Sequence, residues 1–168
     1  MSLERLHHAL RVARSALRRW WPCWLALVVC GIWFQRHYAL GFNCSPSLPY
    51  SVFLIHKGEA VGRDQLVAFR WAGGGPYPAG VTFVKCLKGL PGDLISREGR
   101  RYAINGWPVG EAKTHSRQGL PLEPGPVGRL PPGRYYVQAP HPDSLDSRYA
   151  LTGWIHESQI LGRAHVLF

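Results

Sequence analysis

The sequence predicts a mostly β domain preceded by one helix. Three observations support this: an uncharged apolar stretch from Trp20 to Phe34, short β-rich runs after residue 43, and turn signals between those runs. No long helical pattern follows the apolar stretch. Of the 168 residues, 46% are apolar, which is enough for a packed core and too many for a disordered chain.

Residues 1–19 form a basic segment in which five arginines accompany a single acid, Glu4. Apolar residues recur there at spacings of three and four, which predicts an amphipathic helix on a membrane surface. A helical extension of the following stretch is the alternative, and the pattern fits both. The apolar positions are Leu3, Leu6, Leu10, Ala13 and Leu17.

Residues 20–42 are predicted to be a membrane anchor. The uncharged stretch is shorter than the about 20 residues of a typical span. Arg18 and Arg19 can reach the headgroups at one end, and apolar residues continue to Phe42 at the other. Tryptophans near both ends are typical of membrane interfaces. The upstream arginines predict a cytoplasmic N-terminus and an extracytoplasmic domain over residues 43–168.

Two alternatives to the anchor are a cleaved signal peptide and a buried helix of a soluble protein. No small-residue cleavage site follows the apolar stretch, which weighs against the signal peptide. The net charge is +10, and half of that excess lies in residues 1–42. A basic block beside an apolar segment indicates topology, so we expect a membrane partner and no nucleic acid.

The four cysteines show no metal-binding spacing, and we expect neither a metal nor another cofactor. Cys23 and Cys30 lie inside the apolar stretch. Cys44 and Cys86 follow it, where an oxidising compartment would permit a disulfide. Whether they are bridged is left open.

The domain after residue 43 is expected to consist of short strands and long loops. Asn105-Gly106 between apolar flanks predicts a hairpin with a type I′ turn. Ala72–Gly80 is a predicted loop, and Glu111–Pro132, rich in Gly and Pro, is expected to run over the surface. The predicted strands are Val52–His56, Leu66–Trp71, Val81–Leu87, Asp93–Arg97, Arg134–Ala139 and Ile160–Leu167.

Ser47 is a candidate nucleophile in the segment NCSPSLPYSVFLI. It follows Ser45 by two residues and precedes Pro49 by two, and the proline favours an extended Leu48. A turn serine without a catalytic role is the alternative.

Lys85 is a candidate general base because it lies inside an apolar predicted strand, between Val84 and Cys86. Burial disfavours a charged amine and lowers its pKa, which would make Lys85 a base near neutral pH. Serine–lysine pairs are a known variant of the catalytic triad. An edge-strand lysine that prevents aggregation is the alternative.

Four segments together resemble the membrane-anchored type I signal peptidases of the serine–lysine class. They are SPSLP after the apolar stretch, VKCLKGLPGD, YAINGWPV and DSLDSRYALTGWI. The combination of K-x-x-x-G-L-P-G-D and S-x-D-S-R after a serine motif is specific. The resemblance covers nearly all of residues 43–168 and implies an antiparallel signal-peptidase-like β-domain.

The resemblance also implies roles for individual residues. Ser47 would be the nucleophile and Lys85 the general base, and Ser45 would complete the oxyanion hole with the Ser47 N–H. Ser144 would orient the lysine, and Asp146 and Arg148 would brace the site. An extended substrate would lie beside the strand residues Thr82, Phe83 and Val84.

The chain departs from the housekeeping enzymes of that family. Its serine motif is one residue shorter, a large second β-domain has little room, and G-D-N is lacking before the last motif. These features resemble the conjugative-transfer, TraF-like peptidases that process pilins and in some cases cyclise them. We therefore expect a serine endopeptidase of the bacterial inner membrane that acts on pilin or signal-bearing precursors. A general signal peptidase and a non-enzymatic envelope module are the alternatives.

Overall fold

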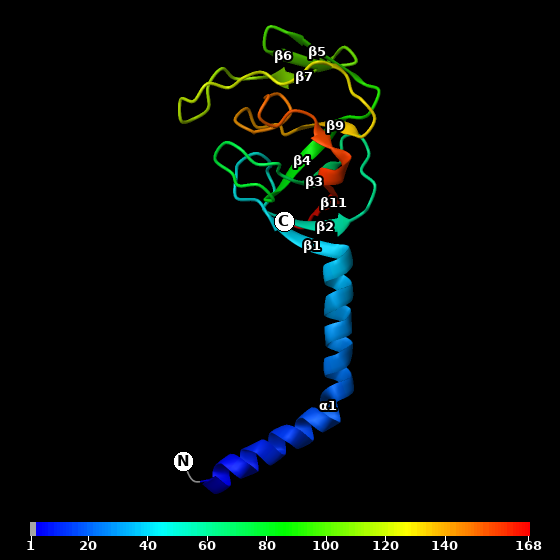
Figure 1. The fold of residues 1–168 in the computed structure, drawn as a ribbon, viewed down its shortest axis with the longest axis vertical. Coiled ribbons are helices and arrows are strands. Elements are labelled where there is room, and N and C mark those ends of the chain that lie inside the picture. Colours follow the sequence, from blue (N-terminus) through cyan, green and yellow to red (C-terminus); the bar gives the residue numbers. More distant parts are fainter. Residues whose placement is uncertain (1–2) are drawn as a thin grey trace. The chain divides into compact units, whose positions relative to one another are not determined.

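Residues 3–168 are described by a computed structural model, with the side chains of residues 7, 8, 14, 15 and 17–168. The chain divides into a helical unit that ends at His37 and a β-rich unit that begins at Tyr38 (Figure 1).

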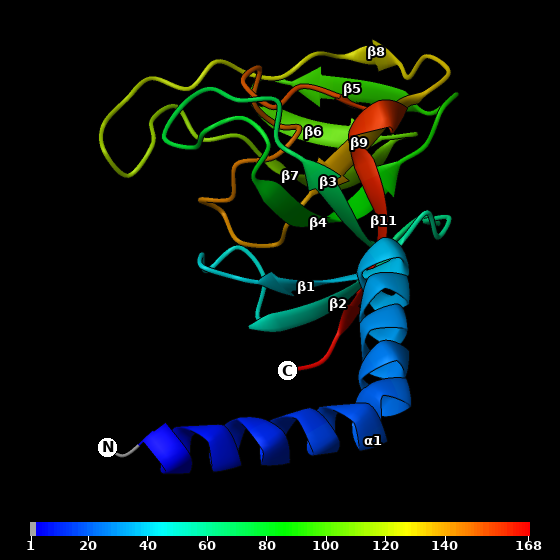
Figure 2. The same cartoon turned by 60° about the horizontal axis from the view of Figure 1, so that its bottom comes forward.

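The helical unit is one continuous helix, α1 (Leu3–His37). It joins the basic segment and the apolar stretch, as the helical-extension alternative expects. Its ribbon bends part of the way along (Figure 2). Pro22 lies inside the helix and cannot donate a hydrogen bond to the carbonyl four residues earlier, which accounts for a bend. Most of the predicted amphipathic leucine stripe lies outside the described side chains.

Residues 20–42, the predicted membrane anchor, are not helical throughout. The helix ends at His37, and Tyr38–Phe42 forms strand β1, which pairs with β2 (Val52–Lys57) in register Tyr38↔His56 to Phe42↔Val52. The alternating pattern of Tyr38, Leu40 and Phe42 is the period of a strand. Within residues 3–168, no helix combines the length and the apolar character that a membrane crossing requires.

The larger sheet of the β-rich unit has seven strands in the order β1-β2-β11-β3-β4-β9-β10, and neighbours are antiparallel. The last strand in sequence order, β11, lies between β2 and β3 in the sheet. The further strands are β3 (Leu66–Arg70), β4 (Thr82–Gly89), β9 (Arg134–Gln138), β10 (Ile155–His156) and β11 (Ile160–Val166).

The smaller sheet has four strands in the order β7-β6-β5-β8, with β5, β6 and β7 drawn together in Figure 2. The β6–β7 hairpin turns at Asn105 and Gly106, whose φ angles of 50° and 85° fit the predicted type I′ turn. The strands are β5 (Leu94–Glu98), β6 (Arg101–Ile104), β7 (Trp107–Glu111) and β8 (Gly128–Arg129).

The prediction of a mostly β domain is confirmed. Each predicted strand matches an observed strand, and their ends differ by no more than two residues. Two-residue strands β8 and β10 and the short 3₁₀ helix Glu157–Gln159 were not predicted. The 3₁₀ helix is the only helix described after His37.

Three groups of buried side chains form the core. One fixes the serine segment, because Leu48 packs with Phe53 and Ile55 of β2. A second lies under β3 and β4, and a third fills the space between the smaller sheet and β9 around Tyr102 and Tyr136. The side chains that carry chemistry thus stand on elements held by packed apolar residues.

Candidate active site

The serine segment forms a turn between β1 and β2. Ser47 is 7% exposed, and its hydroxyl lies 2.9 Å from the hydroxyl of Ser45. Leu48, the next residue, is buried in the core. The turn that carries the two hydroxyls is therefore held in place by the buried side chain of Leu48.

Asn43 organises this turn, a role that the sequence analysis missed. Its Oδ1 accepts the backbone N–H of Ser45 at 3.1 Å and lies 3.2 Å from the Ser45 hydroxyl. Its Nδ2 donates to the carbonyls of Leu48 and Tyr50, at 3.0 and 2.8 Å. An asparagine that bonds the backbone two residues onward is a common turn-forming motif, so the pattern Asn-x-Ser was the available signal.

Lys85 lies in β4 and is 5% exposed. Its amine donates to Ser144 Oγ at 2.8 Å and stands 5.7 Å from the ring centroid of Phe83. Burial lowers the pKa of Lys85 from 10.5 to about 8; the negative charge of Asp146 opposes this shift and the positive charge of Arg148 adds to it. The amine is thus buried and contacts Ser144, whereas the described hydrogen bond of the Ser47 hydroxyl is to Ser45 and not to Lys85.

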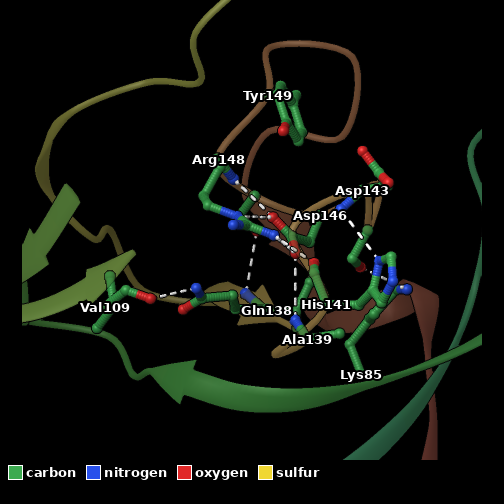
Figure 3. A network of polar contacts seen from close by, with 12 residues as sticks. Lys85, Val109, Gln138, Ala139, His141, Asp143, Asp146, Arg148 and Tyr149 are labelled. Atoms are coloured by element: carbon green, nitrogen blue, oxygen red, sulfur yellow. Dashed lines mark hydrogen bonds and ion pairs between the residues drawn. The ribbon is translucent and has the colours of Figure 1, made fainter. Parts of the chain in front are cut away.

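The loop that carries Ser144 follows β9 and is held by a buried ion pair. Asp146 is fully buried, and Arg148 Nε and Nη2 donate to its two carboxylate oxygens, each at 2.8 Å. The second oxygen of Asp146 also accepts the N–H of Ala139 at 3.1 Å. Figure 3 shows this network, with Lys85 pointing from its strand toward the same loop.

The network also reaches the smaller sheet. Arg148 Nη1 donates to the carbonyl of Glu111 at 3.1 Å, and the Gln138 amide donates to the carbonyl of Val109. Both carbonyls belong to β7, so the buried arginine joins the loop after β9 to the hairpin (Figure 3). The predicted bracing pair Asp146 and Arg148 lies in the same loop as Ser144, shortly after it in the chain.

One cavity of about 760 Å³ brings the predicted residues together. It is lined by Ser45 and Ser47, by Lys85 and Ser144, and by the strand residues that were expected to hold substrate. Asp146 and Arg148 do not line it. The predicted site residues on the wall are Ser45, Ser47, Thr82, Phe83, Val84, Lys85 and Ser144.

Residues Thr82–Lys85 present an open strand edge to this cavity. On one side they pair with β3, in register Phe69↔Phe83 and Val67↔Lys85. On the other side, β9 pairs with β4 only from Cys86 onward, so no described strand covers Thr82–Lys85 there. Their free backbone groups can accept an extended peptide.

The glycine-rich loop Ala72–Gly80 forms another wall of the cavity. Leu151 lies against Gly74 and Gly75, where an added Cβ would come within 2.9 Å of its methyl groups. Both glycines have positive φ angles, 103° and 61°. A side chain at either position would be strained and would displace Leu151.

His141 also lines the cavity, although the sequence indicated no role for any histidine. Its Nδ1 accepts the N–H of Asp143 at 3.2 Å, so the neutral ring carries its proton on Nε2. In that tautomer no ring nitrogen is left to take a proton from a serine. The four cysteines are all free, which leaves no bridge between Cys44 and Cys86.

The chain was compared with protein families, curated proteins and solved structures. A family described as signal peptidase, peptidase S26, matches residues 14–168. No curated protein matches the chain. Among solved structures, the chain is similar to a signal peptidase I from Enterococcus faecalis V583 at 24% identity, covering 66% of this chain and 98% of that one, with a TM-score of 0.43.

The family match spans nearly the whole chain, so this chain belongs to the signal peptidase family, peptidase S26. It is therefore a serine endopeptidase whose substrate is a precursor protein. The alternative of a non-enzymatic envelope module is wrong.

Proposed function

We propose that Ser47 is the nucleophile and Lys85 the general base of a membrane-bound peptidase that matures pilin precursors in conjugative transfer. The observation that carries the catalytic assignment is the buried Lys85 amine, held by Ser144 on the wall of the cavity that Ser47 also lines. With a pKa of about 8, about a quarter of the amines are neutral at pH 7.5, against about 0.1% for a solvated lysine.

The reaction begins when neutral Lys85 takes the proton of the Ser47 hydroxyl, which attacks the scissile carbonyl. Charged Lys85 then protonates the leaving amine, and water or a second amine resolves the ester. Ser144 accepts a hydrogen bond from the lysine and fixes where its lone pair points. Asp146 and Arg148 hold the Ser144 loop, and their opposite charges also act on the pKa of Lys85.

Ser45 is the proposed side-chain donor of the oxyanion hole, beside the N–H of Ser47. In the resting site its hydroxyl stands between Asn43 Oδ1 and Ser47 Oγ, at 3.2 and 2.9 Å. Rotation about its Cβ–Oγ bond would turn the proton from Asn43 to the developing oxyanion. Loss of one such donor typically costs about 10²–10³ in rate.

The substrate is proposed to bind extended along Thr82–Val84. Main-chain hydrogen bonds to the open edge of β4 would hold it irrespective of its sequence, as in other strand-addition complexes. The scissile bond would then lie near the end of the edge where Lys85 stands.

Membrane attachment through α1 is supported by the surface of that helix. Its large apolar side chains between residues 20 and 34 are 42–64% exposed, and such a surface favours lipid or a protein partner over water. Five arginines precede Trp20 in the sequence and predict a cytoplasmic N-terminus with the β-rich unit in the periplasm. The family is typically membrane-associated, which supports the attachment but does not bear on which unit lies on which side.

The pilin assignment rests on the short serine motif and on the small size of the second sheet, which has four strands. Both features fit the TraF-like branch better than the housekeeping signal peptidases. A general signal peptidase of secreted proteins is the second candidate, because the family match does not separate the two branches.

The test is expression of the full chain beside candidate pilins and secreted precursors, with mass spectrometry of the N- and C-termini of the products. We expect a cut pilin, and a mass lower by one water than the cut linear product if cyclisation follows. Ser47→Ala and Lys85→Arg should each abolish processing. Lys88→Arg, three residues on in the same strand and paired with Asp64, is the matched control and should be active. An active Lys85→Arg variant would exclude the proposed mechanism.

A further inference from the structure

Residues 113–122, termed the strap, form a preorganised hairpin-like loop outside both sheets. Ser116 and Leu120 are joined by a backbone hydrogen bond of 2.8 Å, and Leu122 donates to the carbonyl of Thr114 at 2.8 Å. The Ser116 hydroxyl accepts two further backbone N–H groups inside the turn. The side chain of Arg100 holds the two ends, since it donates to the carbonyls of Lys113 and Leu122.

The strap is fastened to the catalytic loop by one carboxylate. Asp143 forms ion pairs with Lys113 and with Arg117 Nε, the latter at 2.8 Å. These two contacts keep the pKa of Asp143 below its ordinary value, first through Lys113 and then through Arg117. Asp143 directly precedes Ser144, which accepts the hydrogen bond of the Lys85 amine. The ion pairs of the strap are therefore made one residue away from Ser144.

The strap also forms one side of the active-site cavity. His115, Arg117 and Leu120 line it, facing a space that Ser47 and Lys85 also line. Figure 2 shows the yellow-green loop after β7 extending beside the loop between β3 and β4. A substrate long enough to pass Ser47 therefore meets the strap.

The charge at this side of the cavity is positive. One carboxylate, Asp143, faces the two cations Lys113 and Arg117, and among the described residues no other acidic side chain lines the cavity. The Arg117 side chain is 64% exposed, so part of its guanidinium is available to a ligand. A precursor with an acidic side chain at this position would gain an attraction, and one with lysine would be repelled.

We propose that the strap is a specificity element, docked on Asp143, that selects precursors carrying a carboxylate side chain near the cleavage site. The charge preference rests on the peptidase function proposed above, whereas the docking does not. Arg117 is the residue that meets the substrate, and Asp143 is a positioning residue that holds the strap.

Docking is tested by limited trypsin digestion of the folded full chain, following cuts after Lys113 and Arg117 by mass spectrometry. Asp143→Asn should accelerate these cuts about threefold to tenfold, since exposed ion pairs of this kind are individually weak. Asp143→Glu should restore much of the protection. Arg101→Gln, which removes an exposed pair with Glu111 outside the cavity, should leave the rate as in the wild type. Equal rates in the wild type and Asp143→Asn would overturn the docking.

Selectivity is tested with peptides copied from a processed precursor, in which one Glu or Lys is moved through the positions flanking the scissile bond. At one position, the Glu peptide should have a kcat/KM about threefold to tenfold above the Lys peptide, mostly through KM. Arg117→Gln should bring that ratio close to one, Arg117→Lys should retain it, and high salt should reduce it. A ratio unchanged by Arg117→Gln would overturn the proposal.

The two assays also separate this proposal from the peptidase function itself. Suppose that no precursor or peptide is cleaved, while trypsin still cuts Asp143→Asn faster than the wild type. The proposed function and the charge preference would then be wrong, and the docking of the strap on Asp143 would be supported. If peptides are cleaved without any charge preference, the strap proposal falls and the peptidase stands.

Discussion

Asn43 links the two ends of the serine turn through one side chain. Its Oδ1 meets the N–H of Ser45, and its Nδ2 meets the carbonyls of Leu48 and Tyr50. Asn43→Ala removes all of these bonds and frees the turn that carries Ser47. Because a displacement of about 1 Å can cost about 10² in rate, we expect a loss of this order in kcat/KM.

Asn43→Asp is the matched variant, since it keeps the acceptor to Ser45 and loses the two donors. Its kcat/KM should lie between those of the wild type and Asn43→Ala, with thermal unfolding measured in parallel to verify folding. An alanine variant as active as the wild type would mean that the turn holds its shape without Asn43.

Lys85 should impose a pH dependence on the reaction. Its neutral amine is the active form, so kcat/KM is expected to rise with pH through an apparent pKa near 8 and level off above it. The profile is measured with a short peptide in overlapping buffers. A profile that is flat between pH 6.5 and 9 (about one and a half units below and one unit above the pKa) would argue against Lys85 as the base.

The same buried amine should cost stability below its pKa. The folded-state pKa of about 8 is lower than the ordinary value of 10.5, so the unfolded chain binds more protons between these values. Stability therefore rises with pH across that window, and the penalty is fully present below pH 8. Lys85→Met should be more stable than the wild type by about 2–3 kcal/mol at pH 7, and by less as the pH approaches 10.5. Chemical denaturation at several pH values measures the difference.

At the scale of elements, the local sequence pattern predicted most strands but, apart from one hairpin, not which strands pair with each other. Strict alternation and turn residues identified the central strands and the Asn105-Gly106 hairpin. β1 was assigned to the anchor because Tyr38, Leu40 and Phe42 were counted for apolar character and not for spacing. The two-residue strands β8 and β10 have too few residues to show any period.

In the candidate site too, contacts between distant residues could not be predicted from local sequence pattern. The contact between Lys85 and Ser144 spans 59 residues, so periodicity and spacing carry no information about it, and only the family resemblance indicated it. His141 and the strap were missed because their roles depend on how separate loops converge on one cavity. Local turn chemistry could have indicated Asn43 alone.

The loop after β9 depends on its buried ion pair. Arg148→Met would leave the fully buried Asp146 carboxylate without its partner, and breaking a buried pair in this way typically costs about 3–5 kcal/mol. Arg101→Met, which breaks an exposed pair, should cost less than about 1 kcal/mol. Denaturant unfolding of both variants makes the comparison. Equal stability would show that Asp146 is satisfied by its backbone contacts alone.

At the scale of the whole molecule, the chain combines a β-rich unit that buries its apolar side chains with a helix that exposes them. Within α1, Trp24, Val28 and Trp33 are each more than half exposed. Apolar surface of this kind is stabilised only when lipid or another protein removes it from water.

The membrane proposal is tested with the full chain. It should sediment with membranes and resist extraction at alkaline pH, and a reporter active only outside the cytoplasm should function when fused to its C-terminus. Replacing both Val28 and Ile32 by arginine should release the protein, because an arginine near the centre of a span costs about 2.5–3.5 kcal/mol. Leu94→Arg, at an exposed apolar position of β5, is the control and should stay with the membrane. A wild-type chain recovered in the soluble fraction would contradict membrane attachment, and a reporter active only in the cytoplasm would contradict the proposed topology.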